Sequence, residues 1–131
     1  MILGVGTDIL HRSRLLPENL RPEDPFFRKV FTPSEQRQGM SGPDPFGWFA
    51  GRFSCKEAVF KALGVDPDSV KLTDIEILDG PDGIPRCTLS GPLGDSVRAR
   101  GGGRVHVSIS AEGETVLSAA VLEAEDTQPN N

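Results

Sequence analysis

Residues 46–64 read FGWFAGRFSCKEAVFKALG, and this segment decides the fold. Its apolar residues recur mostly at the three- and four-residue spacings of one helix face, and no proline interrupts them. Gly64 can supply the C-terminal stop, because glycine readily adopts the left-handed conformation that ends many helices. We therefore predict one long helix over residues 46–63. Its other faces carry the polar residues Arg52, Lys56, Glu57 and Lys61.

Strands are predicted on both sides of this helix. Residues 2–9 are strand-like, and Gly4 and Gly6 within them indicate that another backbone approaches closely. Two hairpins follow the helix, because in each case two β-rich runs flank a cluster of turn residues. The first joins residues 70–78 to residues 86–89, and the second joins residues 105–110 to residues 116–122.

Short helices are expected between these elements. Thr32, Pro33 and Glu35 have the spacing of a capping box with proline at the first helical position, so a helix should start there and end by Gly39. Further short helices are expected over residues 12–16 and 95–100. Loops are expected around Pro22 and Pro25, over residues 40–45, and at the glycine run 101–103. Helices combined with two hairpins predict an α+β fold.

The composition limits the classes of protein to consider. A chain of 131 residues suffices for one domain, which we place at residues 1–123, with residues 124–131 as a disordered tail. The formal net charge of -5 argues against a general nucleic-acid binder, although acidic residues near the C-terminus leave room for a local basic patch. No run reaches membrane-spanning length, and no targeting signal is legible at the N-terminus. Two cysteines without ligand spacing favour a reducing compartment.

Four polar residues are candidates for chemistry: Asp8 at a strand end, Glu57 and Lys61 one helical turn apart, and His106 in an apolar strand. Each also has an ordinary structural interpretation. Asp8 can be a turn former or a helix cap, and Glu57 and Lys61 can form a surface ion pair. His106 can be a hydrogen-bonded core residue. Residue type and spacing alone leave both interpretations open.

Four segments of the chain form a recognisable series. They are residues 4–9 (GVGTDI), Arg14, residues 49–64 (FAGRFSCKEAVFKALG) and residues 106–110 (HVSIS). Their order and spacing closely resemble the holo-acyl-carrier-protein synthase family of phosphopantetheinyl transferases, and the resemblance extends from residue 1 to about residue 122. It implies the family's α+β fold, a long helix packed on an antiparallel sheet. It also implies a homotrimer with active sites between neighbouring subunits.

The resemblance implies a magnesium-dependent transferase. In this family a serine hydroxyl of an acyl carrier protein attacks the β-phosphate of coenzyme A, receives the 4'-phosphopantetheine arm and releases 3',5'-ADP. Asp8 and Glu57 match the magnesium ligands, and a hard cation held by two carboxylates suits an anionic pyrophosphate. Asp8, Glu57 and His106 are the implied catalytic residues. The acceptor of the serine proton is left open among Glu57, a water near the metal and His106.

The resemblance also assigns binding residues. Lys61 and Arg52 would contact phosphates, and the turn at residues 83–85 would border the adenine. The residues implied in binding coenzyme A are Asp8, Arg52, Lys56, Glu57, Lys61, Gly64, Pro85, His106 and Ser108. Arg12 and Arg14 are implied contacts to the carrier protein, because a local basic patch would attract an acidic partner.

Two positions depart from the family pattern. His11 stands where the family often has glutamate, and Ala111 where it often has histidine. Neither change removes an implied metal ligand, but coenzyme A affinity or carrier preference can differ from the family norm. Three functions are therefore weighed: a transferase that modifies a fatty-acid synthase carrier, a coenzyme A or nucleotide-binding module without catalysis, and a purely structural trimer. The expected compartment is the cytoplasm, or the mitochondrial matrix in a eukaryote, and neither nucleic acid nor membrane is an expected partner.

Overall fold

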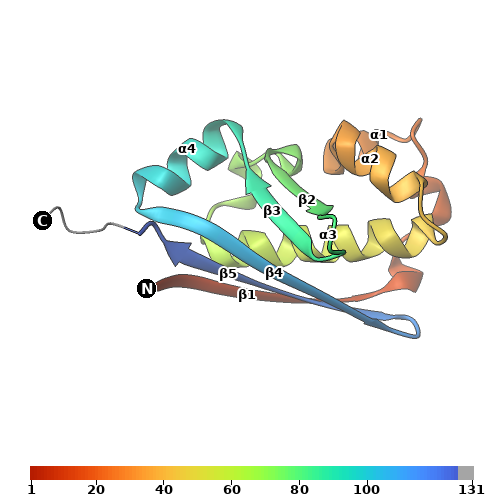
Figure 1. Cartoon of the computed structure of the whole chain (residues 1–131). Coiled ribbons are helices and arrows are strands. Elements are labelled where there is room, and N and C mark those ends of the chain that lie inside the picture. Colours follow the sequence, from red (N-terminus) through yellow and green to blue (C-terminus); the bar gives the residue numbers. More distant parts are fainter. Residues whose placement is uncertain (127–131) are drawn as a thin grey trace, which may run out of the picture.

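The computed structural model describes residues 1–126 of the chain. Its strands and α-helices are, in chain order, β1 (Ile2–His11), α1 (Pro25–Val30), α2 (Pro33–Met40), α3 (Pro45–Leu63), β2 (Ile75–Asp79), β3 (Pro85–Leu89), α4 (Gly91–Ala99), β4 (Gly102–Glu112) and β5 (Thr115–Ala124). Three strands form an antiparallel sheet in the order β1-β5-β4, and β2 and β3 form a separate antiparallel hairpin (Figure 1). This confirms the predicted α+β fold and both predicted hairpins.

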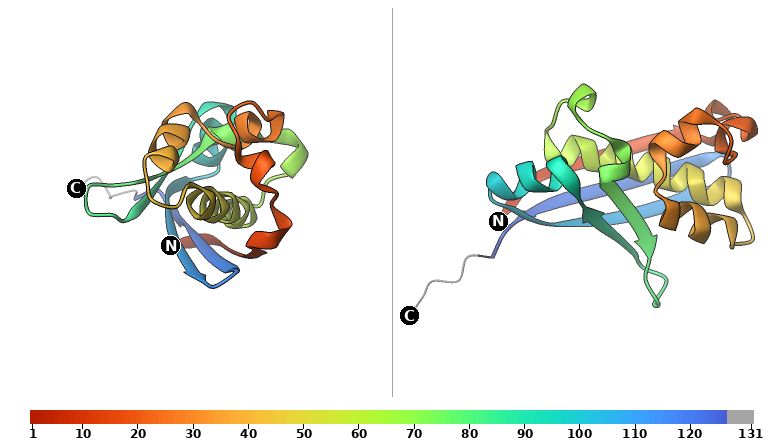
Figure 2. Two further views of the ribbon diagram at one scale, coloured as in Figure 1. Left: turned by 90° about the vertical axis from the view of Figure 1, so that its right-hand side faces the viewer. Right: turned by 90° about the horizontal axis from the view of Figure 1, so that it is seen from above.

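The long helix α3 occupies the middle of the molecule. The three-stranded sheet covers one side of it, and the β2–β3 hairpin with the shorter helices covers the other (Figure 2). Toward its N-terminal end, Phe49 packs against Phe27 and Phe31, with ring centroids 4.9 and 4.8 Å apart. Toward its C-terminal end, buried residues such as Val59 join a second apolar cluster with the hairpin and the sheet. A helix enclosed in this way is apolar on most of its surface.

Two glycines of β1 allow the strand to lie directly against α3. A Cβ atom on Gly4 would overlap the carbonyl oxygen of Ala62, and a Cβ atom on Gly6 would overlap that of Ala58. The obstacles are helix backbone, which cannot move aside as a flexible side chain would. The predicted close backbone approach is therefore confirmed, and it brings the next residues of β1 within reach of α3.

The helix signals in the sequence act as predicted. The Thr32 side chain accepts a hydrogen bond from the backbone N–H of Glu35, and the Glu35 side chain accepts one from the backbone N–H of Thr32. These two bonds complete the capping box of α2. Gly64 ends α3 in the left-handed conformation, with φ at 64°. The Asp44 side chain caps the start of α3, so the helix begins at Pro45, one residue earlier than predicted.

Several other boundaries differ from the prediction. β2 begins at Ile75 rather than at residue 70, and the helix expected over residues 12–16 is a 3-10 turn over Arg12–Arg14. The segment around Pro25 was expected to be a loop but forms α1, because Asp24 caps the helix and Pro25 occupies its first turn. Helix α4 begins at Gly91 rather than at Asp95, and β4 begins at Gly102, inside the glycine run. β5 continues through Ala124, one residue beyond the predicted domain limit, and the Ala124 N–H donates a hydrogen bond to Met1 O. The N–H of the next residue, Glu125, donates a hydrogen bond to Gly101 O, and residues 127–131 of the predicted tail lie outside the described residues.

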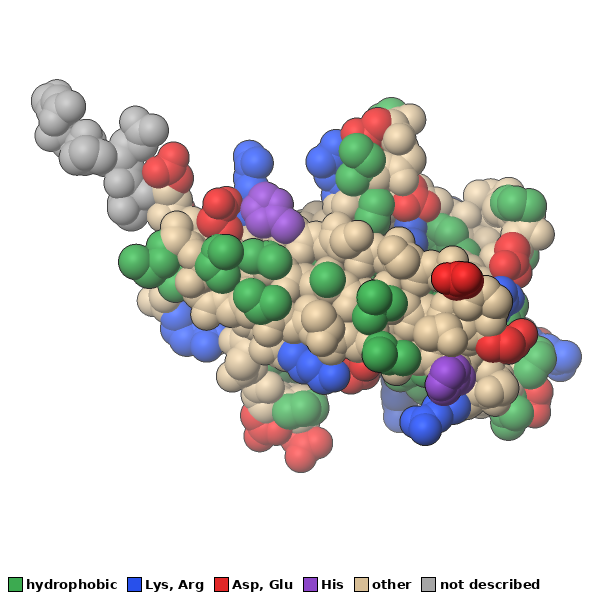
Figure 3. Space-filling model, turned by 90° about the horizontal axis from the view of Figure 1, so that it is seen from below, with side chains coloured by type: hydrophobic (Ala, Val, Ile, Leu, Met, Phe, Trp, Pro, Cys, Tyr) green, Lys and Arg blue, Asp and Glu red, His purple; other side chains and the backbone are tan. Residues whose placement is uncertain are grey.

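The face of the sheet turned away from α3 is open, and exposed apolar side chains lie on it among polar ones (Figure 3). Val5 and Ile9 of β1 are 61% and 67% exposed, and Leu117 of β5, the direct partner of Ile9, is also exposed. We call this surface the open sheet face. Among the helices within residues 1–126, none combines the length and the apolar character needed to cross a membrane.

Candidate active site

The β1–α3 contact brings two carboxylates and a lysine together. Asp8 of β1 points toward α3, on which Glu57 and Lys61 lie one helical turn apart. Lys61 Nζ lies 3.7 Å from Asp8 Oδ1 and donates a hydrogen bond to Thr7 O at 2.9 Å. Burial raises the pKa of Glu57, the charge of Asp8 raises it further, and Lys61 partly offsets these effects. The two carboxylates therefore share one site.

This pair has the chemistry of an open magnesium site. Within residues 1–126 no group of three or more His, Cys, Asp or Glu residues could enclose a metal ion. Mg²⁺ is commonly held by one or two carboxylates, with substrate phosphates and water as the remaining ligands. Asp8 and Glu57 fit that donor set, and Lys61, whose side chain is 58% exposed, adds a positive charge beside it.

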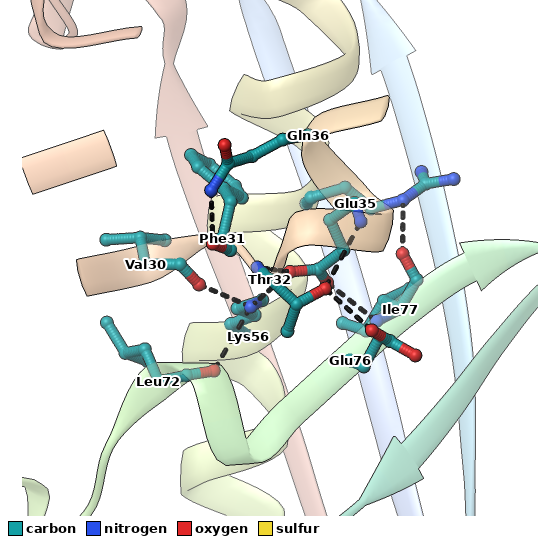
Figure 4. A network of polar contacts seen from close by, with 10 residues as sticks. Val30, Phe31, Thr32, Glu35, Gln36, Lys56, Leu72, Glu76 and Ile77 are labelled. Atoms are coloured by element: carbon teal, nitrogen blue, oxygen red, sulfur yellow. Dashed lines mark hydrogen bonds and ion pairs between the residues drawn. The ribbon is translucent and has the colours of Figure 1, made fainter. Parts of the chain in front are cut away.

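The structure corrects the placement of Lys56, which was predicted on an outer face of the helix and as a contact to coenzyme A. Lys56 is fully buried beneath the hairpin (Figure 4). Its ammonium donates to Glu35 Oε1 at 2.7 Å, to Leu72 O at 3.1 Å and to Val30 O. Burial lowers the pKa of Lys56, and Glu35 opposes that shift. All three N–H donors of this ammonium bond to protein acceptors, which leaves none directed at a ligand.

Glu35 is the residue that the sequence reasoning missed. It is fully buried, and besides Lys56 it accepts hydrogen bonds from Thr32 N at 2.8 Å and from Ile77 N at 2.7 Å (Figure 4). One carboxylate thus joins α2, α3 and β2. The capping-box spacing identified Glu35 as a helix-start residue, but no local signal pointed to its partners on distant elements.

Arg52 lies one turn before Lys56 and is 6% exposed. Its Nε donates to Ile77 O at 3.1 Å, and its guanidinium stacks 4.2 Å above the Trp48 ring. Its Nη2 forms an ion pair with Asp79 but has no aligned hydrogen bond. Arg52 is held at the end of β2, and its contact with a phosphate stays a prediction.

His106 and Ser108 lie on the other face of the sheet. Ser118 of β5 pairs with Asp8 of β1 and with Ile109 of β4, so these side chains share the face toward α3. Because side chains alternate along a strand, His106 and Ser108 point to the open sheet face. His106 is exposed, with Nε2 3.3 Å from Glu123 Oε1.

A groove with a volume of about 590 Å³ lies between β3, α4 and β4. Pro85 and His106 both line it, together with the positively charged residues Arg86, Arg98 and Arg104. Arg86 and Arg98 also form exposed ion pairs with Asp82 and Asp95. Positive charge in such a lining suits a ligand that carries phosphate groups. Neither Asp8 nor Glu57 lines the groove, because β1 and β4 are the two opposite edge strands of the sheet.

Apart from Arg52 and Lys56, the residues predicted to bind coenzyme A or the metal therefore form two groups in one chain. Asp8, Glu57 and Lys61 lie between β1 and α3, and Gly64 ends the same helix one turn later. Pro85, His106 and Ser108 lie on the side of β4. The structure does not bring the two groups together within a single chain.

The predicted carrier contacts lie in the 3-10 turn η1 (Arg12–Arg14), directly after β1. Arg12 forms an ion pair with Asp44 at 3.4 Å and lies 5.1 Å from the Phe46 ring centroid. Arg14 is exposed. The turn is continuous with the strand that carries Asp8, so a partner bound at η1 would lie near the carboxylate pair.

Comparisons with known proteins identify relatives of this chain. Residues 4–110 match the model of the 4'-phosphopantetheinyl transferase superfamily. A holo-[acyl-carrier-protein] synthase of Nitratidesulfovibrio vulgaris is 35% identical over 125 residues, which cover 95% of this chain and 100% of the relative. The crystal structure of the Neisseria meningitidis holo-[acyl-carrier-protein] synthase has a TM-score of 0.83 at 32% identity and covers 94% of this chain and 99% of that one.

A third similar protein carries a ligand. The structure of a Bacillus anthracis holo-(acyl-carrier-protein) synthase in complex with CoA (3',5'-ADP) has a TM-score of 0.75 at 30% identity and covers 95% of this chain and 99% of that one. The family model and the near full-length relatives together identify the family. The chain belongs to the holo-acyl-carrier-protein synthases of the 4'-phosphopantetheinyl transferase superfamily.

Proposed function

We propose that this chain transfers the 4'-phosphopantetheine arm of coenzyme A to a serine of an apo acyl carrier protein, giving the holo carrier and 3',5'-ADP. The observation that carries the proposal is the carboxylate pair of Asp8 and Glu57 beside Lys61, in a member of this family. Relatives named as holo-acyl-carrier-protein synthases, and the complex of one of them with coenzyme A, support it.

The residues of the site have separable tasks in this reaction. Asp8 and Glu57 would hold Mg²⁺, which supplies positive charge to the pyrophosphate oxygens when bound. Lys61 would contact a phosphate as a compact cation. The serine oxygen forms a bond to the β-phosphorus as the bond between that phosphorus and the oxygen of 3',5'-ADP breaks. The serine proton has to be taken up by a base at the site, and Glu57, His106 and a water molecule are the candidates.

A shared site between neighbouring copies would unite the two groups of residues. The group at β1 and the group at β4 are different surfaces, so an interface that joins them is head-to-tail, and such an interface forms a ring when the rotation between copies closes. The open sheet face supplies apolar surface for the contact. We therefore propose a homotrimer in which one copy contributes Asp8, Glu57 and Lys61, and the next contributes His106 with the groove beside it.

The test of the transfer reaction is the mass of the carrier protein. Apo acyl carrier protein is incubated with coenzyme A, Mg²⁺ and the full chain, and a panel of carriers from fatty-acid, polyketide and peptide synthases is compared. We expect a fatty-acid synthase carrier to gain the mass of the arm, and we expect a chelator to abolish the gain. Binding of coenzyme A without a mass gain on any carrier would favour the inactive-module alternative, and no binding at all would favour a structural trimer.

Mixing two inactive variants tests the shared site. Glu57→Gln and His106→Ala are each expected to be nearly inactive, whereas an equimolar mixture, after subunit exchange, should recover about a quarter of the wild-type rate. The recovery arises because one site in four then pairs an intact Glu57 with an intact His106 from the next copy. Carrier modification followed by mass spectrometry gives the rate. A mixture no more active than its components would contradict a site shared between copies.

Charge reversal at Arg14 tests the carrier surface. Arg14→Glu is expected to raise the KM for the carrier about tenfold and to leave the KM for coenzyme A unchanged, because an exposed positive charge steers an acidic partner. Lys71→Glu reverses another exposed charge and serves as the control. Steady-state kinetics at two salt concentrations measure both constants. An equal rise in both KM values would contradict the assignment.

A further inference from the structure

Two serines that have no role in the proposed reaction lie between the sheet and α3. Ser54 belongs to α3 and Ser118 to β5, and both are fully buried. Ser118 Oγ donates to Ser54 Oγ at 3.0 Å, and Ser54 Oγ donates to Asp8 Oδ2 at 2.9 Å. These two hydroxyls therefore form a chain that joins β5, α3 and β1 and ends on the carboxylate of Asp8.

The direction of the chain follows from its last acceptor. A buried hydroxyl is destabilising unless it is hydrogen-bonded, and an ionised carboxylate can only accept. Ser54 therefore uses its proton on Asp8, which leaves the Ser54 oxygen to accept from Ser118. A bond to a charged acceptor is stronger than one between neutral groups, and linked hydroxyls polarise one another.

The chain makes the two oxygens of Asp8 unequal. Oδ2 is turned inward and accepts from Ser54, whereas Oδ1 lies 3.7 Å from the exposed Lys61 ammonium. Ser54 and Glu57 are three residues apart on α3, so they are neighbours on its surface. Fixing Oδ2 restricts rotation of the carboxylate and keeps Oδ1 directed to the side where a cation can be reached.

We propose that Ser54 and Ser118 are positioning residues of the magnesium site, with Ser54 orienting the Asp8 carboxylate and Ser118 orienting Ser54. The inference rests on the proposed function, because it takes Asp8 as a metal ligand. Metal-binding side chains are themselves held by hydrogen bonds from residues behind them, and losing such a bond weakens metal binding by about 10- to 100-fold.

The test measures metal binding rather than turnover. Mn²⁺, a paramagnetic substitute for Mg²⁺, is titrated into the full chain with saturating coenzyme A, and free Mn²⁺ is followed by electron paramagnetic resonance. Ser54→Ala is expected to raise the dissociation constant about tenfold, and Ser118→Ala to raise it by less. The double variant should equal Ser54→Ala, because Ser118 acts only through Ser54. Ser96→Ala, an exposed serine of α4, should leave the constant unchanged.

A graded substitution guards against a packing effect. Ser54→Cys keeps a weak donor at nearly the same volume, so its dissociation constant should fall between those of the wild type and Ser54→Ala. Thermal melting checks that each variant is folded before titration. An unchanged constant in Ser54→Ala, or additive effects of the two alanine substitutions, would overturn the positioning role.

Carrier modification measured in the same samples separates this inference from the proposed function. A wild-type chain that modifies the carrier while Ser54→Ala binds Mn²⁺ normally would overturn the positioning role and leave the transferase assignment intact. A wild-type chain that fails to modify any carrier, but whose Mn²⁺ binding depends on Ser54 as described, would support the positioning role and overturn the transferase assignment.

Discussion

Replacing Glu57 with glutamine is expected to lower kcat/KM for carrier modification about a thousandfold, which corresponds to ~4 kcal/mol of lost transition-state stabilisation. The amide keeps the shape of the side chain but removes the negative charge from the pair formed with Asp8 and cannot accept the serine proton. The measurement is the initial rate of carrier mass gain at several Mg²⁺ concentrations. Glu112→Gln changes an exposed glutamate of β4 and should leave the rate unaltered.

The same substitution has a predicted effect on the pH dependence of stability in the absence of metal. Because the folded-state pKa of Glu57 is raised above the ordinary value of 4.5, the folded chain binds more protons than the unfolded chain between the two values. The wild-type free energy of unfolding should therefore fall as pH rises through that window, and Glu57→Gln should remove this contribution. Near-normal turnover in Glu57→Gln would refute the catalytic role whatever the stability data show.

Replacing Lys56 with methionine is expected to destabilise the chain by about 3–5 kcal/mol, because it leaves the Glu35 carboxylate buried without its cation. The two backbone donors at Thr32 and Ile77 remain, but they do not neutralise the charge. Thermal and urea denaturation measure the loss, which should lower the melting temperature by about 10 °C or more in a domain of this size.

Two further variants distinguish the stability lost with the ion pair from the stability lost with the lysine side chain itself. Lys56→Met combined with Glu35→Gln should recover part of the stability, because a neutral amide can still accept from the backbone donors and leaves no unpaired charge. Lys29→Met, at an exposed position of α1, should change the free energy of unfolding by less than about 0.5 kcal/mol. A Lys56→Met chain as stable as the wild type would contradict the importance of the buried pair.

Much of the fold could be predicted because its signals are local. The helical spacing of residues 46–63, the capping box at Thr32 and the turn clusters each act over a few residues, and the structure confirms them. The glycines at 4 and 6 also indicated a close approach before its partner was known. α1 was missed because its prolines suggested a loop, whereas the Asp24–Pro25 pair is a helix start.

The interior of the site could not be predicted in the same way. Lys56 stands beside Glu57 in the sequence, and a helix enclosed on two sides gives no amphipathic pattern that tells which of them faces inward. Glu35 meets Ile77 across 42 positions of sequence, which no local spacing reveals. The separation of Asp8 from His106 depends on the pairing of β1 with β5, two strands at opposite ends of the chain.

Asp8 and His106 lie on opposite faces of one sheet. In the proposed ring, the activity of each molecule would therefore depend on the concentration of the protein. An isolated chain would carry two incomplete half-sites and would modify no carrier. Activity per molecule would then fall on dilution below the dissociation constant of the ring, as association follows mass action. At concentrations near or below that constant, halving the amount of the chain would remove more than half of the capacity to activate carriers, so the response would resemble a threshold rather than a proportion.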